Sequence, residues 1–252
     1  MIRWLVQSIV DHPDLSTGHP PAGLLTVAET AQYGGYLSPR RRRDWLLGRW
    51  TAKRLVQTHL IATEGFRPAL DSFRIEQYPS GAPYVYGEHP ALYKATHNGQ
   101  MPLLLSISHS HGYAFCALCV EDRGYARLGV DIELVEPRSD NFVQEFFTAE
   151  EQSCLGRCSL ALSDLMLTAT WSAKEAALKA THLGLRADPR SVQCLLHPEC
   201  PRLWRPFRVE VQADRVDMAR TGALRGWWRV MENRLRPGHY FVLTIVAQGV
   251  AL

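Results

Sequence analysis

The side chains best suited to chemistry begin in the stretch Leu128-Gly-Val-Asp-Ile-Glu133. Its apolar residues alternate with Asp131 and Glu133, which predicts a β-strand. Side chains two residues apart on a strand point to the same face, so the two carboxylates are expected side by side. Hard oxygen ligands suit Mg²⁺, which completes its coordination with water and phosphate oxygens.

A second stretch, Trp171-Ser-Ala-Lys-Glu-Ala-Ala-Leu-Lys179, follows about forty residues later and predicts a helix. Glu175 and Lys179 are four residues apart, so they share one helix face. If that face packs on the strand, three carboxylates and one ammonium converge, which indicates a Mg²⁺ site. Alternatively, the strand carboxylates face solvent, and Glu175 and Lys179 form an ordinary surface ion pair.

The chain has 252 residues, of which 46% are hydrophobic and 21% are charged, with a formal net charge of +3. This length allows one large domain or two smaller lobes with a real core. The weak positive charge does not by itself predict nucleic-acid binding, but it is compatible with an anionic substrate or an acidic partner. No apolar run is long enough for a membrane-spanning helix, and the N-terminus resembles a first strand rather than a signal peptide.

The six cysteines are scattered, and only one pair forms a known motif. Cys116 and Cys119 form a C-x-x-C, but they lie in an apolar stretch that predicts a strand, where residues three apart face opposite sides. No histidine or second C-x-x-C completes a zinc set. We therefore expect reduced thiols in a cytoplasmic protein.

The remaining patterns predict an α+β fold. Ser38 and Pro39 are start signals for a long helix that runs to about Thr63. Thr148-Ala-Glu-Glu151 is a capping box that opens another helix. Further helices are expected over 24–34, 137–147 and 160–182, and strands over 2–10, 71–78, 84–86, 103–107, 113–120, 128–133, 190–196, 207–212, 226–232 and 240–247.

An internal echo suggests two similar halves. Trp50-Thr-Ala-Lys-Arg54 and Trp171-Ser-Ala-Lys-Glu175 match in type at four of five places, and each lies within a predicted helix. We infer two pseudo-symmetric lobes, residues 1–124 and 125–252, each a long helix packed on an antiparallel sheet, with a ligand cleft between them. Because Arg54 stands in the place of Glu175, one lobe would offer cations and the other carboxylates.

Positive charge gathers in the first long helix. The run from Arg40 to Arg43 is explained equally well by a solvated basic face. Arg49 and Lys53 lie four residues apart among apolar neighbours, so they are better candidates for binding an anion. Ser106-Ile-Ser-His-Ser110 closes an apolar strand and offers hydroxyls, a histidine and turn amides to phosphate oxygens.

Together these stretches resemble the 4′-phosphopantetheinyl transferases of the long, two-lobed, surfactin-synthetase-activating type. Such enzymes transfer 4′-phosphopantetheine from coenzyme A to a serine of an apo acyl or peptidyl carrier protein and release 3′,5′-adenosine diphosphate. The resemblance implies a holo-[acyl-carrier-protein] synthase activity that serves fatty acid, polyketide or nonribosomal peptide synthesis. The matching stretches are Gly81-Ala-Pro83, Ser106-Ile-Ser-His-Ser110, Gly129-Val-Asp-Ile-Glu133, Phe146-Phe-Thr-Ala-Glu-Glu151 and Trp171-Ser-Ala-Lys-Glu-Ala-Ala-Leu-Lys179.

The resemblance also implies roles for individual residues. Asp131, Glu133 and Glu175 match the ligands of Mg²⁺, in whose place Mn²⁺ can stand. Glu175 also matches the general base, acting directly or through a water, and Lys179 a catalytic group that stabilises or protonates the leaving phosphate. The residues that match contacts to coenzyme A are Arg49, Gly81, Ala82, Ser108, His109, Asp131 and Lys179.

Three positions depart from the family pattern. Trp45 stands where some members carry a phosphate-binding Thr, Ala82 where some carry Lys, and Ser106 where Asn is commoner. The four arginines from Arg40 to Arg43 are all candidates for the 3′-phosphate. As partners we expect coenzyme A and an apo carrier protein that docks near Pro137 to Phe147, with no nucleic acid, no membrane and a monomeric chain.

Two other classes of function compete with the transferase. A Mg²⁺-dependent nucleotide phosphohydrolase would need a positioned water but no docking surface for a carrier. A non-catalytic module would bind a carrier protein or a nucleic acid through the helix that holds Arg40 to Arg43. The acidic set argues against the module, because buried carboxylates without a metal repel a polyanion.

Overall fold

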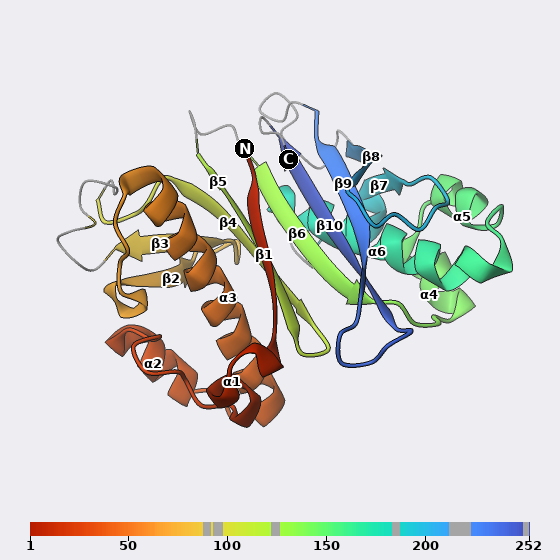
Figure 1. The fold of residues 1–252 in the computed structure, drawn as a ribbon. Coiled ribbons are helices and arrows are strands. Elements are labelled where there is room, and N and C mark those ends of the chain that lie inside the picture. The colour runs from red at the N-terminus through yellow and green to blue at the C-terminus, as the bar shows by residue number, and fades with distance from the viewer. Residues whose placement is uncertain (88–91, 93–97, 122–126, 183–186, 212–222, 249–251) are drawn as a thin grey trace. The chain divides into compact units, whose positions relative to one another are not determined.

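The computed structural model describes residues 1–87, 92, 98–121, 127–182, 187–211, 223–248 and 252. It combines helices with antiparallel strands, so the predicted α+β class is confirmed (Figure 1). The chain forms two compact units, Met1–Gly124 with Leu252 and Tyr125–Ala251. In the part of the chain so described, no helix is long and apolar enough to cross a membrane.

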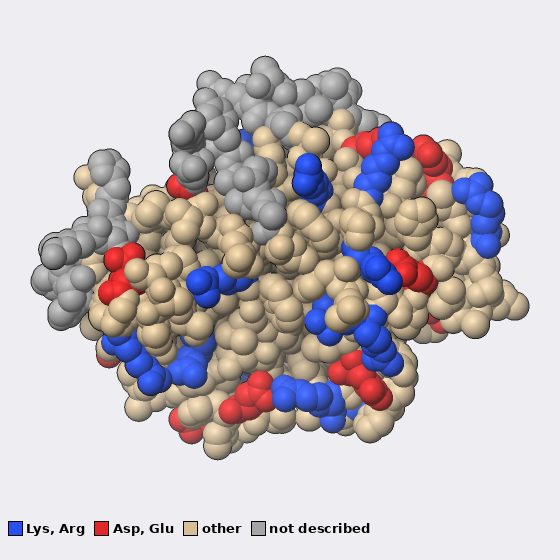
Figure 2. All heavy atoms as spheres, turned by 45° about the horizontal axis from the view of Figure 1, so that its top comes forward, with Lys and Arg blue, Asp and Glu red and all other residues tan. Residues whose placement is uncertain are grey.

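Charged side chains of both signs are mixed on the surface that Figure 2 shows. On this face the described Lys and Arg side chains lie among Asp and Glu side chains and among uncharged ones. The mixture agrees with the small net charge of +3.

The first unit contains a three-stranded antiparallel sheet and a separate hairpin. Its elements are β1 (Arg3–Ser8), η1 (Ile9–Asp11), α1 (Pro13–Thr17), α2 (Val27–Gly34), α3 (Pro39–Glu64), η2 (Leu70–Ser72), β2 (Phe73–Gln77), β3 (Pro83–Gly87), β4 (Leu103–Ser110) and β5 (Tyr113–Val120). The sheet has the order β1-β5-β4, and β2 pairs with β3. Helix α3 packs on the sheet, and α1 and α2 contact α3.

Helix α3 begins and ends close to the predicted signals. Ser38 is its N-cap, whose Oγ accepts a hydrogen bond from the Arg41 N–H at 3.4 Å, and Pro39 takes the first helical position. Gly65 follows with a φ of 72°, a left-handed conformation that glycine adopts without strain. The core between α3 and the strands includes Ala52, Leu55, Val56, Leu60, Leu103, Leu105, Cys116 and Leu118.

The second unit contains a five-stranded antiparallel sheet. Its elements are β6 (Arg127–Leu134), α4 (Asp140–Phe146), α5 (Ala149–Leu155), η4 (Leu160–Leu162), α6 (Ser163–Ala180), η6 (Pro189–Ser191), β7 (Val192–Leu195), β8 (Arg205–Val211), β9 (Arg225–Glu232) and β10 (Tyr240–Gln248). The strand order is β6-β10-β9-β8-β7. The capping box predicted for α5 is confirmed, since Thr148 and Glu151 exchange hydrogen bonds at 3.3 and 2.8 Å.

Helix α6 approaches β6 and β10 closely because small residues line the contact. A Cβ atom at Gly129 of β6 would lie 2.0 Å from the carbonyl oxygen of Ala176 and 2.6 Å from the nitrogen of Ala180. The hydroxyls of Ser172 and Thr244, 2.9 Å apart, link α6 to β10. The glycine that precedes the two strand carboxylates is therefore required by the helix above it.

Several boundaries differ from the sequence predictions for local reasons. The second long helix begins at Ser163, because residues 160–162 form the separate short helix η4. Strand β4 continues to Ser110, so the turn is reduced to His111 and Gly112, with φ of 47° and 78°. Positive φ at both residues matches a two-residue hairpin turn. The sequence also predicts a hairpin turn at Glu121-Asp-Arg-Gly124, of which residues 122–124 lie outside the described residues, and a helix end at Gly184, which lies outside them too.

Replacement of Gly129 tests whether the close approach of α6 is needed. We expect Gly129→Ala to lower the free energy of unfolding by about 1–3 kcal/mol or more, because backbone atoms of α6 would have to move. Urea denaturation measures the change. Gly34→Ala is the control, since an added Cβ there meets nothing within 4 Å, and equal effects of the two changes would contradict the argument.

Candidate active site

Strand β6 and helix α6 bring predicted site residues together in the second unit. Gly129 lies under α6, and the alternation along β6 places Asp131 and Glu133 on that same face. The Asp131 side chain is only 4% exposed, and Lys179 Nζ donates to its Oδ1 at 2.7 Å and to the Val130 carbonyl at 3.1 Å. The alternative of a solvent-facing carboxylate is therefore wrong for Asp131.

Burial and mutual repulsion raise the pKa of two carboxylates in this group. The pKa of Glu133 rises to about 7, because the group is buried and Asp131 repels its charge, while Arg138 at 3.4 Å opposes the shift. Burial also raises the pKa of Glu175, which Lys179 opposes and Asp131 reinforces. The three acids thus act on one another electrostatically.

The donor chemistry of this group suits a hard divalent cation. Oε1 of Glu175 is buried and has no hydrogen-bond partner among the described residues, and a cation would relieve the repulsion between the acids. Within the described ranges, however, no set of three or more His, Cys, Asp or Glu side chains is grouped so that it could hold a metal ion. Mg²⁺ held by Asp131, Glu133 and Glu175 therefore stays a prediction.

Lys174 precedes Glu175 in the sequence but lies in the core, fully buried. Its Nζ donates to both carboxylate oxygens of Glu151, at 2.9 and 2.7 Å, and to the Val192 carbonyl at 2.6 Å. Glu151 also accepts a hydrogen bond from the Cys194 N–H at 2.7 Å. Lys174 thus joins α6 to the start of α5 and to β7, which fixes the orientation of the helix that carries Glu175.

Lys53 occupies the matching place in the first unit. Because it is buried and paired there, the expectation that it binds an anion is wrong. It is fully buried and forms an ion pair with Glu29. Glu29 also accepts a hydrogen bond from the Ile75 N–H at 3.0 Å. The ammonium has no reason to face a ligand, because it already donates to three carbonyl oxygens at 2.7–2.9 Å, those of Leu24, Leu70 and Phe73.

The two lysine networks are built alike, which explains the repeated Trp-x-Ala-Lys sequence. In each unit the glutamate is the third helical residue after a capping threonine, Thr26 or Thr148. In each, the strand residue that donates its N–H to the glutamate lies two positions after a residue whose carbonyl accepts from the lysine. Glu29 was not among the predicted residues, although Thr26-Val-Ala-Glu29 has the T-x-x-E spacing of a capping box.

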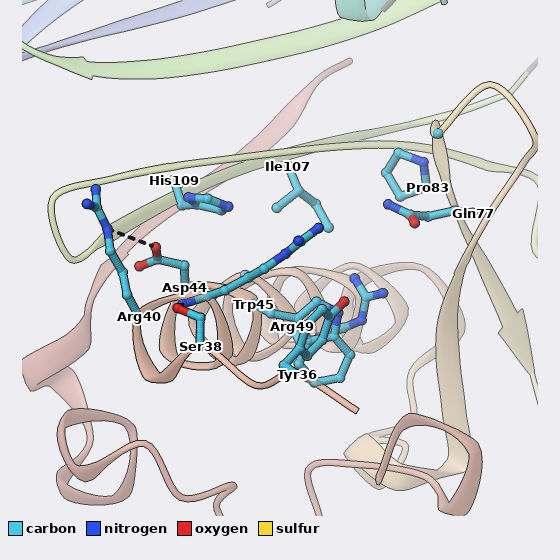
Figure 3. Close-up of a pocket in the computed structure, with 13 residues that line it drawn as sticks. Tyr36, Ser38, Arg40, Asp44, Trp45, Arg49, Gln77, Pro83, Ile107 and His109 are labelled. Atoms are coloured by element: carbon cyan, nitrogen blue, oxygen red, sulfur yellow. Dashed lines mark hydrogen bonds and ion pairs between the residues drawn. The ribbon is translucent and has the colours of Figure 1, made fainter. Parts of the chain in front are cut away.

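A pocket of about 570 Å³ in the first unit is lined by several residues predicted to bind coenzyme A. Arg49 of α3, Gly81 between β2 and β3, and His109 of β4 all line it (Figure 3). Arg40 and Arg41 at the start of α3 line it as well. Three guanidinium groups and an imidazole make this pocket suited to a ligand that carries phosphate.

Arg49 is the most deeply buried cation of this pocket, with 5% of the residue exposed. Its guanidinium carbon lies 4.7 Å from the ring centroid of Trp45, and its Nε lies 3.6 Å from the carboxylate of Glu29. Burial lowers the pKa of Arg49, and the negative charge of Glu29 opposes this shift. Trp45 therefore supports the arginine through its ring face, a role that a phosphate-binding hydroxyl at this position would not supply.

The structure sorts the four arginines at the start of α3. Arg40 and Arg41 line the pocket. Arg42 instead donates to the Tyr36 carbonyl at 2.7 Å, and Arg43 is exposed and not among the lining residues. Only the first two are therefore placed to meet a ligand in this pocket.

Ser108 and Ala82, also predicted at coenzyme A, are not among the residues that line this pocket. Ile107 and His109 line it, so the alternation of β4 places Ser108 on the opposite face, where it is 7% exposed. Ala82 follows Gly81, whose φ of 86° makes the turn between β2 and β3. Their contacts to coenzyme A stay predictions.

The expected docking segment of the carrier protein forms an aromatic group beside the acids. Phe142 and Phe146 of α4 lie 4.9 and 5.4 Å from the ring of Trp171. The Arg138 guanidinium lies 4.8 Å from the Phe142 ring and also pairs with Glu133. Arg138 thus connects this segment to the acidic group, while docking itself stays a prediction.

The raised pKa of Glu133 predicts a pH dependence of stability. The folded protein keeps the Glu133 proton to a higher pH than the unfolded chain does, so the free energy of unfolding should fall as pH rises from about 4.5 to about 7. We expect Glu133→Gln to lose less stability than the wild type over this window, as measured by urea denaturation with a chelator present. Glu136→Gln, at an exposed carboxylate, should behave like the wild type, and identical profiles for all three proteins would contradict the assignment.

Comparisons with known proteins give a family model that matches part of the second unit, and similar solved structures. Residues 127–213 match the model of the 4′-phosphopantetheinyl transferase superfamily. The holo-[acyl-carrier-protein] synthase of Neisseria meningitidis is similar at 20% identity and a TM-score of 0.39, over 48% of this chain and 97% of that one. That of Helicobacter pylori, solved in complex with coenzyme A, is similar at 17% identity and a TM-score of 0.35, over 48% of this chain and 99% of that one.

Comparison with curated protein sequences gives no match. The region that matches the superfamily model nevertheless contains all four residues predicted for chemistry, namely Asp131, Glu133, Glu175 and Lys179. It also contains Glu151 and Lys174, which hold α6 in place. Over residues 127–213 the chain matches the model of the 4′-phosphopantetheinyl transferase superfamily, in agreement with its motifs, and the long two-lobed type stays a prediction.

Proposed function

We propose that this protein transfers 4′-phosphopantetheine from coenzyme A to a serine hydroxyl of an apo acyl or peptidyl carrier protein and releases 3′,5′-adenosine diphosphate. The observation that carries the proposal is the contact of Lys179 Nζ with Asp131 Oδ1 at 2.7 Å, inside the region that matches the superfamily. It brings a cation from α6, which could stabilise charge on a phosphate, beside an acid from β6 that is a candidate metal ligand.

The side chains of the site have complementary roles in this reaction. The serine oxygen forms a bond to the β-phosphorus of coenzyme A, and the bond from that phosphorus to the bridging oxygen breaks. Glu175, whose pKa is raised by burial, accepts the serine proton directly or through a water. Lys179 donates hydrogen bonds to the leaving phosphate. Mg²⁺ held by Asp131, Glu133 and Glu175 would neutralise charge on the diphosphate.

The pocket of the first unit supplies the cations for the nucleotide end of coenzyme A. Arg49 and His109 line it together with Arg40 and Arg41. Arg40 is already engaged, since its Nε lies 3.9 Å from Asp44, so we assign the 3′-phosphate to Arg41. From the sequence resemblance we also propose that the ligand occupies a cleft between two pseudo-symmetric lobes.

Incubation with an apo carrier protein tests the reaction. With coenzyme A and Mg²⁺, we expect the carrier mass to increase by about 340 Da, the mass of the transferred group. Glu175→Gln should reduce the rate about 10³-fold while the circular dichroism spectrum is retained, because the proton acceptor is lost. Glu136→Gln is the control. Loss of coenzyme A without a mass gain on any of several carriers would favour a phosphohydrolase.

A comparison of coenzyme A with its 3′-dephospho form tests the assignment of Arg41. We expect Arg41→Ala to weaken binding of coenzyme A about tenfold, the size of one charged contact, and to leave the affinity for the dephospho form nearly unchanged. Isothermal titration calorimetry measures both affinities. Arg43→Ala, outside the pocket lining, should retain the wild-type preference, and an equal loss for both ligands in Arg41→Ala would contradict the assignment.

A further inference from the structure

Glu29 of α2 is a buried carboxylate that contacts two cations of α3. It is 2% exposed and forms an ion pair with Lys53 through Oε2. Its Oε1 accepts from the Ile75 N–H at 3.0 Å and lies 3.6 Å from Arg49 Nε. One carboxylate therefore lies beside two cations, and the buried group of Glu29, Arg49 and Lys53 carries a net charge of +1.

The second unit shows what the same network looks like without the additional cation. Glu151 holds Lys174 and a strand N–H, as Glu29 holds Lys53 and a strand N–H. Arg49 lies four residues before Lys53, and the residue four before Lys174 is Thr170. Since the network with one cation is complete, the arginine is an addition that the fold itself does not require.

Arg49 is placed so that its two ends face different surroundings. Its Nε is buried near Glu29 and has no hydrogen-bond partner among the described residues. The side chain lines the pocket that Arg41 and His109 also line, and it lies beside Trp45 (Figure 3). It also lines a smaller cavity of about 320 Å³ together with Glu29. Glu29 thus holds one side of the guanidinium and leaves the other for an anion.

We propose that Glu29 is a positioning residue for the anion-binding pocket, acting through Arg49. This inference rests on the proposed function, in that the anion is a phosphate group of coenzyme A. Glu29 orients the guanidinium between its own carboxylate and the Trp45 ring, so the arginine pays little ordering entropy when the phosphate arrives. Lys53 does not depend on Glu29 alone for its position, because it also donates to three carbonyl oxygens.

A double-mutant cycle on the full-length protein tests the proposal, with coenzyme A affinity measured by calorimetry in the presence of Mg²⁺. We expect Glu29→Gln to weaken binding about tenfold, within the range for residues that share one ion-pair network. In an Arg49→Ala background, which itself binds weakly, Glu29→Gln should have no further effect. Glu29→Asp keeps the charge but moves it one methylene further from Arg49, so it should weaken binding severalfold. This variant takes the place of Glu29→Gln in the cycle if Glu29→Gln does not fold.

Gln57→Ala is the control for a purely structural effect. It removes a buried hydrogen bond from α3 to the Pro68 carbonyl, at 2.7 Å, and Gln57 does not line the pocket, so it should lower the free energy of unfolding and leave coenzyme A affinity unchanged. Two outcomes would show that the inference is wrong while the wild type binds coenzyme A. In the first, the Glu29→Gln variant binds coenzyme A as tightly as the wild type. In the second, Glu29→Gln weakens binding by the same factor in the Arg49→Ala background as in the wild type. If the wild type does not bind coenzyme A at all, the proposed function and the inference are both overturned.

Discussion

The fold of both units depends on a buried lysine whose charge is neutralised inside the core. Moving an ammonium and a carboxylate out of water costs several kcal/mol each, and their attraction offsets this only when the remaining hydrogen bonds are satisfied. Lys174 meets this condition through Glu151 and one carbonyl, and Lys53 through Glu29 and three. Removing one partner typically costs 3–5 kcal/mol, so each network ties a short helix, a long helix and a strand together strongly.

The chemistry of the site follows from this structural arrangement. Lys174 and Glu175 are neighbours in the sequence, but the first anchors α6 in the core and the second belongs to the acidic group. Likewise, Lys53 anchors α3, and Arg49 one turn earlier lines the pocket. In each unit an internal ion pair fixes the rotation of a helix, and the orientation of a chemically useful side chain on the same helix follows from it.

Much of this was accessible from the sequence, because the signals were local. The Ser38-Pro39 start, the Thr148 capping box and the alternation of β6 each depend on residues close together in the chain, and each is found as predicted. Other features depend on partners far away in the sequence. Nothing near Lys53 indicates that Glu29 neutralises it.

The ends of strands also limit what the sequence predicts about the pocket. Since β4 runs on to Ser110, two neighbouring predicted ligands, Ser108 and His109, fall on opposite faces. A difference of three residues in a strand end cannot be read from hydrophobicity alone, yet it decides which side chains reach the pocket. The ligand set for a metal likewise depends on distances between segments, which spacing along the chain does not determine.

The missing side chain at Gly129 has a mechanical consequence. With the backbone of α6 this near to β6, neither element can slide along the other without collision between main-chain atoms. Sliding of one element along the other is therefore excluded, so the backbone positions that carry Lys179 and Asp131 keep their separation. If the proposed function holds, an opening that admits a carrier protein or releases a product comes from motions that carry β6 and α6 together as one rigid piece.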